Sequence, residues 1–153
     1  MGTIRIKTGH EGHSGTDGFL SAKVVLDTCN PNPGRDGDMA VAARAKETGV
    51  ASAEFLPGVR LVRALNTVGY GALRSGAHRA GDKVAIPLAA ADEAALKIAI
   101  QLGQDAGFEP VVVGPLARAK EFDTGTPVME RRSRQPNCAE ALEWFPEGIS
   151  RAD

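Results

Sequence analysis

Two polar segments that could bind a ligand each follow a short apolar run in this sequence. Residues 27–30, DTCN, follow the run 24–26, and Asn66 and Thr67 close the run 59–65. Runs this short predict strands that are buried on both faces, as in a parallel sheet. Ligands bind outside the carboxyl ends of parallel strands, so we expect the two segments to meet at one mouth. A turn rich in polar residues is the alternative interpretation of each segment.

Asn30 is the residue of the first segment best placed to contact a ligand. Pro31 follows it and disfavours the helical backbone region, so we expect Asn30 to be extended with its amide directed outward. Tyr70 and His78 could each donate a proton in a reaction. Neither has a visible partner in the sequence, and a surface position is the simpler interpretation. The catalytic residues therefore stay unknown from the sequence.

Histidines and glycines gather near the beginning of the sequence. His10 and His13 have a spacing that a metal could use on a helix. Glycines at 9, 12, 15 and 18 oppose a helix there, so we predict solvated histidines and no metal site. The same glycines lack the pattern G-x-G-x-x-G that places a backbone around a dinucleotide phosphate. We expect residues 1–22 to form a flexible, glycine-rich leader.

Composition excludes several classes of function. A chain of 153 residues, 42% hydrophobic, can bury the core of one domain. The net charge of −1 and the 5% aromatic content argue against a nucleic-acid partner. No apolar run has the length of a membrane span and no signal peptide is visible. The two distant cysteines are typical of free thiols in a reducing compartment, so we expect a cytoplasmic protein with no membrane partner.

The predicted elements alternate along residues 23–153. Alternating strands and helices predict an α/β fold with parallel crossovers, here a three-layer, mostly parallel sheet in a single domain. A helix that begins at Asp92 and ends before Gly107 is the clearest of them, with apolar residues at helical spacing. Residues 69–81 could be a loop or a short helix. The strands are expected at 23–27, 59–68, 83–89 and 108–113, and the other helices at 39–49 and 51–56.

Four runs taken together resemble the second half of the deazaflavin-dependent NADP reductases and related NADPH-dependent oxidoreductases. They are VVLDTCNPNPGRDG, LPGVRLVRALNTV, DEAALKIAIQLGQDAGFEPVVVGPLARA and FDTGTPV, and they span residues 23–128 in order. The resemblance implies a Rossmann-type domain, an NADP cofactor, and hydride transfer to a deazaflavin, a flavin or another small-molecule acceptor. It also implies a homodimer.

The resemblance implies cofactor-binding roles for three segments. Asn30 and Pro31 would lie beside the nicotinamide and its ribose. Residues 64–67, with Ala64, Asn66 and Thr67, would form the wall under the nicotinamide. A third segment would close the side of the site that faces the hydride acceptor, namely Gly114, Pro115 and Leu116. A hydride step of this kind needs geometry and cofactor electronics more than a general base on the protein.

The sequence departs from this family before Lys23. Family members open with a strand, a glycine fingerprint and a helix, which hold the dinucleotide. Our hypothesis is an incomplete Rossmann-like member whose dinucleotide-binding half is absent or supplied by a partner chain. The alternative is a non-catalytic α/β module for dimerisation or partner binding that has lost the cofactor.

The end of the sequence also differs from the family. Arg131, Arg132 and Arg134 could meet the 2′-phosphate of NADP. A solvated charged loop is the alternative for these arginines. Trp144 and Phe145 are expected either to cover exposed core or to form a dimer contact.

Overall fold

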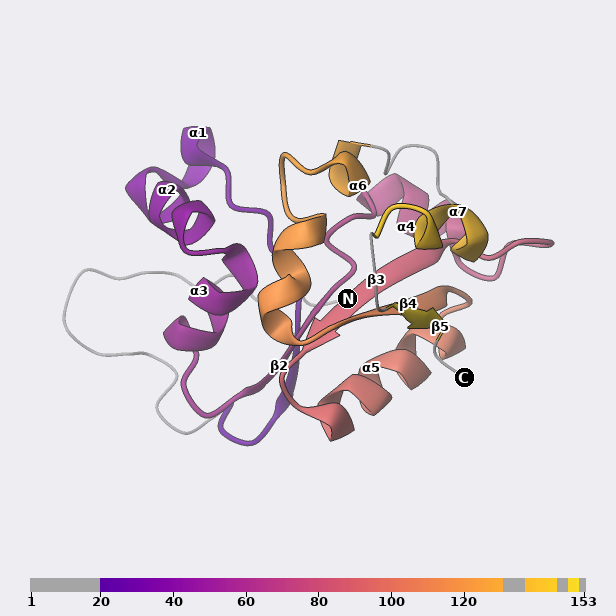
Figure 1. Ribbon diagram of the computed structural model, residues 1–153, viewed down its shortest axis with the longest axis horizontal. Helices are drawn as coiled ribbons and strands as arrows, with labels where there is room; N and C mark the ends of the chain where they lie inside the picture. Colours follow the sequence, from indigo (N-terminus) through magenta and orange to yellow (C-terminus); the bar gives the residue numbers. More distant parts are fainter. Residues whose placement is uncertain (1–19, 131–136, 146–148, 152–153) are drawn as a thin grey trace.

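A computed structural model describes residues 20–130, 137–145 and 149–151 (Figure 1). Residues 1–19, which are most of the predicted leader and include His10 and His13, lie outside these ranges. Arg131, Arg132 and Arg134 also lie outside them.

One open sheet forms the centre of the fold. Its strand order is β1-β2-β3-β4-β5. Two of the three pairings among β1 to β4 are parallel, namely β1 with β2 and β3 with β4. This confirms the prediction of an α/β fold with an incomplete, Rossmann-like, mostly parallel sheet. The strands are β1 (Val24–Asp27), β2 (Arg60–Ala64), β3 (Ala85–Ala90), β4 (Glu109–Gly114) and β5 (Ser150–Arg151).

One predicted crossover is wrong, because β2 and β3 are antiparallel. The connection between them contains the helix α4 (Tyr70–Gly76), which resolves the choice between a loop and a short helix. A helix of seven residues spans only about 10 Å, whereas the five-residue β2 spans about 17 Å. The chain therefore does not return to the starting end of β2, and β3 begins near the end at which β2 stops.

The two helices predicted at 39–49 and 51–56 are both present, but the break between them comes earlier than predicted. They are α2 (Asp38–Ala45) and α3 (Thr48–Phe55), separated at Glu47, whose φ of +71° lies outside the helical region. A single turn, α1 (Pro33–Asp36), precedes them and is capped by the side chain of Asn32. These three helices connect β1 to β2.

The helix α5 (Glu93–Asp105) is confirmed as predicted. The Asp92 side chain caps it by accepting a hydrogen bond of 2.7 Å from the Ala95 N–H. Gly103 lets it lie close to the sheet, since a Cβ there would be 2.9 Å from Ile86 Cδ1. The remaining helices are the 3-10 helix η1 (Leu116–Phe122), α6 (Pro127–Glu130) and α7 (Cys138–Leu142).

Helices cover both faces of the sheet, which gives the predicted three layers. On one face α5 packs its small residues Ala95 and Ala99 against Val62, Ile86 and Leu88. On the other face η1 and α7 pack against the strands, and α3 packs against η1 (Figure 1). The second face is the one that carries the candidate site.

Trp144 and Phe145 cover this second face rather than protrude from it. Phe145 is buried and meets the ring of Phe122 edge to face, with 6.5 Å between ring centroids. Both side chains pack with residues of β3 and β4. Of the two expectations for this pair, the covering of core is the one that the structure shows.

In the parts of the chain described, no helix combines the length and apolarity that a bilayer span requires.

Candidate functional site

The two polar segments meet at one mouth, as predicted from the sequence. The Asn30 Nδ2 donates a hydrogen bond of 2.8 Å to the carbonyl oxygen of Asn66. This bond joins the carboxyl ends of β1 and β2, which run parallel. We call this place the Asn30–Asn66 mouth.

A second hydrogen bond holds the side chain of Asn66. Its Nδ2 donates a hydrogen bond of 2.9 Å to the carbonyl oxygen of Phe122, the last residue of η1. Its own Oδ1 and that of Asn30 are buried and accept no hydrogen bond within the described part of the structure. Such buried acceptors are rare in native proteins, and each calls for an explanation. Two of them side by side indicate a place where a ligand N–H group would be stabilised.

A buried ionic cluster lies behind the mouth. Arg63 is fully buried in β2 and donates to Asp123 Oδ1 through Nη2 at 2.7 Å and Nε at 3.2 Å. Its Nη1 lies 3.2 Å from Asp27 Oδ2. The Thr48 N–H donates to the second oxygen of Asp123, and the Cys29 N–H donates to Asp27 Oδ1. We call Asp27, Arg63 and Asp123 the ionic cluster; its formal charge is −1.

The sheet register explains how the cluster forms. Asp27 lies directly opposite Arg63 in the parallel pairing, so both side chains project from the same face. That face is covered by η1, whose end brings Asp123 to them. Because Asp27 and Arg63 each lie three residues before Asn30 and Asn66, the cluster lies just beneath the mouth.

The predicted third wall, Gly114, Pro115 and Leu116, follows β4, which runs antiparallel to β1 and β2. Gly114 is level with Arg63 in the sheet but two strands away from it, because both residues pair with Ala89 of β3. The chain then runs toward the beginning of β2, where Leu116 packs with Leu61. On the third side of the mouth the structure places Phe122, after η1 has returned across the sheet.

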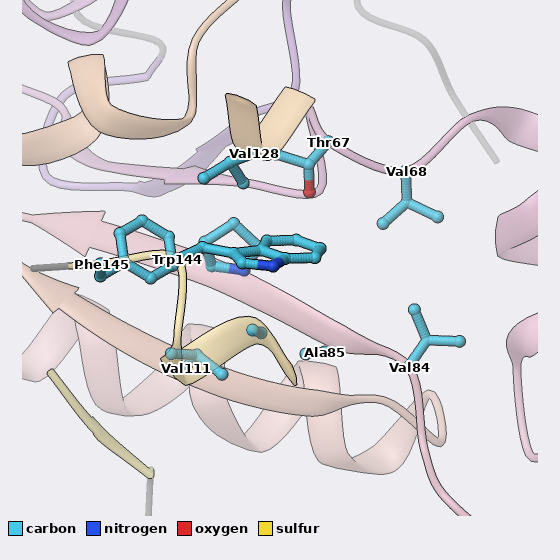
Figure 2. Close-up of a pocket in the computed structure, with 10 residues that line it drawn as sticks. Thr67, Val68, Val84, Ala85, Val111, Val128, Trp144 and Phe145 are labelled. Carbon is cyan, nitrogen blue, oxygen red and sulfur yellow. The ribbon is translucent and has the colours of Figure 1, made fainter. Parts of the chain in front are cut away.

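The other predicted wall residues differ from one another. Ala64 is fully buried in the core beneath α5, so only its backbone can border the mouth. Thr67 lines an apolar hollow of about 10 Å³, which is no more than the room for one water molecule. Figure 2 shows the Trp144 indole lying between Thr67 and Val128 on one side and Val111 and Ala85 on the other. The Trp144 side chain therefore occupies this space, and the hollow that is left is too small for a cofactor.

Two exposed arginines border the outer side of the mouth. Arg44 Nε donates a hydrogen bond of 2.8 Å to the carbonyl oxygen of Pro31. Arg35 Nη2 donates one of 3.2 Å to the carbonyl oxygen of Asn30, and Arg35 also pairs with Asp36. The outer border is thus cationic, whereas the buried floor is anionic.

Within the residues described, no group of three His, Cys, Asp or Glu side chains could hold a metal ion.

Asp27 belongs to the predicted segment 27–30, but Arg63, Asp123 and the Phe122 carbonyl were not among the residues predicted for the site. Arg63 carries the signal that the sequence offered, since it is a charged residue directly between the apolar residues Val62 and Ala64. A buried charge needs a partner of opposite sign, which predicts a functional or structural pair. Nothing in the sequence indicates which carboxylate that partner is, because Asp123 is 60 residues away.

Cys29 lies in the loop over the cluster and should be an unreactive thiol. Although the residue is exposed, partial desolvation of its thiol and the Asp27 carboxylate raise its pKa to about 11. The raised pKa stabilises the folded protein at neutral pH, and this contribution is lost as the pH rises from about 9 to about 11. In a Cys138→Ser background, the rate of alkylation by iodoacetamide should reach half its maximum near pH 11. A midpoint near pH 8.5, the ordinary value for cysteine, would contradict this environment.

Comparison with known proteins supports the fold and no function. No family model matches this chain, and no curated protein matches it. A solved structure of a hypothetical protein from Sinorhizobium meliloti, SMa0349, is similar with a TM-score of 0.57 at 23% identity. The similarity covers 71% of this chain and 53% of that protein, so this chain spans about half its length.

Proposed function

We propose that the chain takes part in hydride transfer between NADP(H) and a deazaflavin, a flavin or another small acceptor, with the nicotinamide at the Asn30–Asn66 mouth. The observation that carries the proposal is the pair of buried, unpartnered Oδ1 atoms at the ends of two parallel strands. Ligands bind at this position in open α/β sheets. The resemblance of residues 23–128 to NADP reductases supplies the identity of the cofactor.

The mouth fits the carboxamide of a nicotinamide. A primary amide offers N–H donors, and the Oδ1 atoms of Asn30 and Asn66 are acceptors without a donor. Because both atoms are buried, a ligand reaches them only after the half-buried Asn30 side chain rotates. The cofactor supplies the hydride chemistry, and the chain's own residues orient the ring and exclude water from it.

The chain offers few residues that could bind the phosphate groups of the cofactor. Arg35 and Arg44 are the cationic side chains at the border, and both are exposed and close to the mouth. The pattern G-x-G-x-x-G, which would place backbone N–H groups around the phosphates, is not found among residues 20–130. A second copy of this chain has the same residues, so we place that part of the cofactor site on a separate nucleotide-binding polypeptide. The proposal also includes a cytoplasmic homodimer of this chain, as the resemblance implies.

A second candidate function is a non-catalytic module for dimerisation or partner binding. β1 is an edge strand, and no strand pairs with its outer side in the described parts of the sheet. Three large apolar side chains on the neighbouring helices α2 and α3 are about half exposed, namely Met39, Val41 and Phe55. An open edge beside exposed apolar side chains is typical of a surface that binds another chain.

Titration with NADPH, followed by cofactor fluorescence, separates the two candidates. Because this chain supplies the nicotinamide end of the site but not the phosphate end, we expect weak, saturable binding by the wild-type chain. Asn66→Ala should weaken it about tenfold, because a buried hydrogen bond to the ligand is lost. Asn137→Ala is the matched control, since Asn137 caps α7 and donates to Asp82, and neither contact involves Asn30 or Asn66, so binding should be unchanged. Thermal unfolding of each variant shows whether the fold is intact. Absence of saturable binding to the wild-type chain would favour the non-catalytic module.

Hydride transfer is then measured directly. Oxidation of NADPH in the presence of a deazaflavin acceptor should be lost in Asn66→Ala and retained in Asn137→Ala. Binding without turnover by the wild-type chain would place the acceptor site on the partner chain.

A further inference from the structure

We propose that the ionic cluster of Asp27, Arg63 and Asp123 makes the mouth select the oxidised, cationic nicotinamide over the neutral reduced form. This inference rests on the proposed function and adds to it a preference for one redox state. It assigns the cluster a role in tuning the site, since none of its side chains lies at the mouth itself.

The cluster carries more negative than positive charge in a buried place. It contains two carboxylates and one guanidinium, and Arg63 has no exposed surface. Asp123 is well compensated, because it accepts hydrogen bonds from Arg63 and from the Thr48 N–H. Asp27 is compensated less, since its Oδ2 has an ion-pair contact at 3.2 Å but no hydrogen bond. The residual negative charge is therefore concentrated on Asp27.

Asp27 is coupled to the mouth by the backbone of its own loop. The Cys29 N–H, immediately before Asn30, donates a hydrogen bond of 2.9 Å to Asp27 Oδ1. A ring seated on Asn30 and Asn66 would thus lie above a buried anion with little water between them. In such an environment a unit charge acts across several ångströms with far less screening than in water.

The two arginines at the outer border of the mouth are exposed, whereas the ionic cluster is buried. Arg35 is paired with Asp36, and Arg44 is exposed, so both are screened by solvent. A cationic outer border and an anionic floor match the charges of NADP⁺, in which anionic phosphates are joined to a cationic ring. The reduced cofactor has the same phosphates but a neutral ring. Only the floor can therefore distinguish the two forms.

The preference acts on the hydride step between bound reactants. When NADPH gives up its hydride, a proton with two electrons, to a deazaflavin or flavin, the ring is left with one positive charge. The acceptor takes the hydride together with one proton from solvent. The buried carboxylate stabilises the charge that appears on the ring, so the equilibrium between the bound forms should lie toward bound NADP⁺, while the overall equilibrium of the reaction is unchanged.

The test compares dissociation constants for NADP⁺ and NADPH in the wild-type chain and in Asp27→Asn. The wild-type chain should bind NADP⁺ more tightly than NADPH, and Asp27→Asn should reduce that ratio about tenfold. The amide of Asn can still accept from the Cys29 N–H. Asp38→Asn removes the same charge from the exposed start of α2 and should leave the ratio unchanged. A ratio of dissociation constants responds to charge, whereas a general loss of structure weakens both forms alike.

Cationic 1-methylnicotinamide and neutral nicotinamide, compared by NMR titration, repeat the test without phosphates. If Asp27→Asn does not fold, Asp123→Asn replaces it, and the wild-type preference stands as a test by itself. Equal affinity of the wild-type chain for both redox forms would overturn the inference while leaving the proposed function intact. A ratio unchanged in the folded Asp variants would overturn it as well. Absence of binding by either form and either fragment would overturn both proposals.

Discussion

Arg63→Ala is expected to lower the free energy of unfolding by about 3–5 kcal/mol, the largest effect of any single side chain at the site. The guanidinium is fully buried between two carboxylates. Removing it leaves Asp27 and Asp123 buried near each other without a compensating cation, and a cavity in place of the side chain. Equilibrium unfolding in urea measures the change.

Two comparisons show whether charge is the cause. Arg60→Ala removes a guanidinium from the same strand, but its partner Asp92 is partly exposed, so the loss should be much smaller. The triple variant Arg63→Met, Asp27→Leu and Asp123→Asn should recover much of the stability, because well-packed apolar groups can replace a buried ion pair at little cost. If Arg63→Ala alone were nearly neutral, the cluster would not be buried as described.

Gly107→Ala should destabilise the chain by several kcal/mol for a different reason. Gly107 ends α5 with φ +82°, and a Cβ there would lie 2.3 Å from the His78 backbone nitrogen and 2.7 Å from its Cα. The left-handed backbone costs about 1–2 kcal/mol for a residue with a Cβ, and the clash with backbone adds to it. Thermal and urea unfolding measure the loss.

Gly81→Ala is the matched control for this substitution. Gly81 has a similar φ of +76°, but nothing lies within 4 Å of the position that a Cβ would take there. The strain of the backbone is thus nearly the same in both variants, and only Gly107→Ala adds the steric conflict. Equal losses in the two variants would mean that the contact between Gly107 and His78 can relax around the added methyl group.

Much of the candidate site could be predicted because its signals are local. Short apolar runs predicted β1 and β2, and the polar residues after them predicted where the strands end. Asn30 and Asn66 are brought together by parallel pairing, which is the usual consequence of a helical connection between neighbouring strands. The N-cap Asp92 and Gly107 likewise marked the two ends of α5.

The parts that could not be predicted depend on contacts distant in the sequence. Whether β3 returns parallel or antiparallel depends on how far the segment with α4 travels, and this is not encoded in a periodic pattern. Because of this reversal β4 runs antiparallel to β1 and β2, and the chain after Gly114 runs toward Leu61, away from the mouth. Asp123 reaches Arg63 only because η1 crosses back over that sheet. The resemblance contained the run FDTGTPV but gave no role to its aspartate.

The return of η1 over the sheet has a consequence for truncated chains. The mouth is walled by two strand ends and by a segment that follows β3 and β4 in the sequence. No fragment that stops before Phe122 contains all three walls. A chain cut after β4 would keep both strand ends but lose the carbonyl that holds the Asn66 side chain.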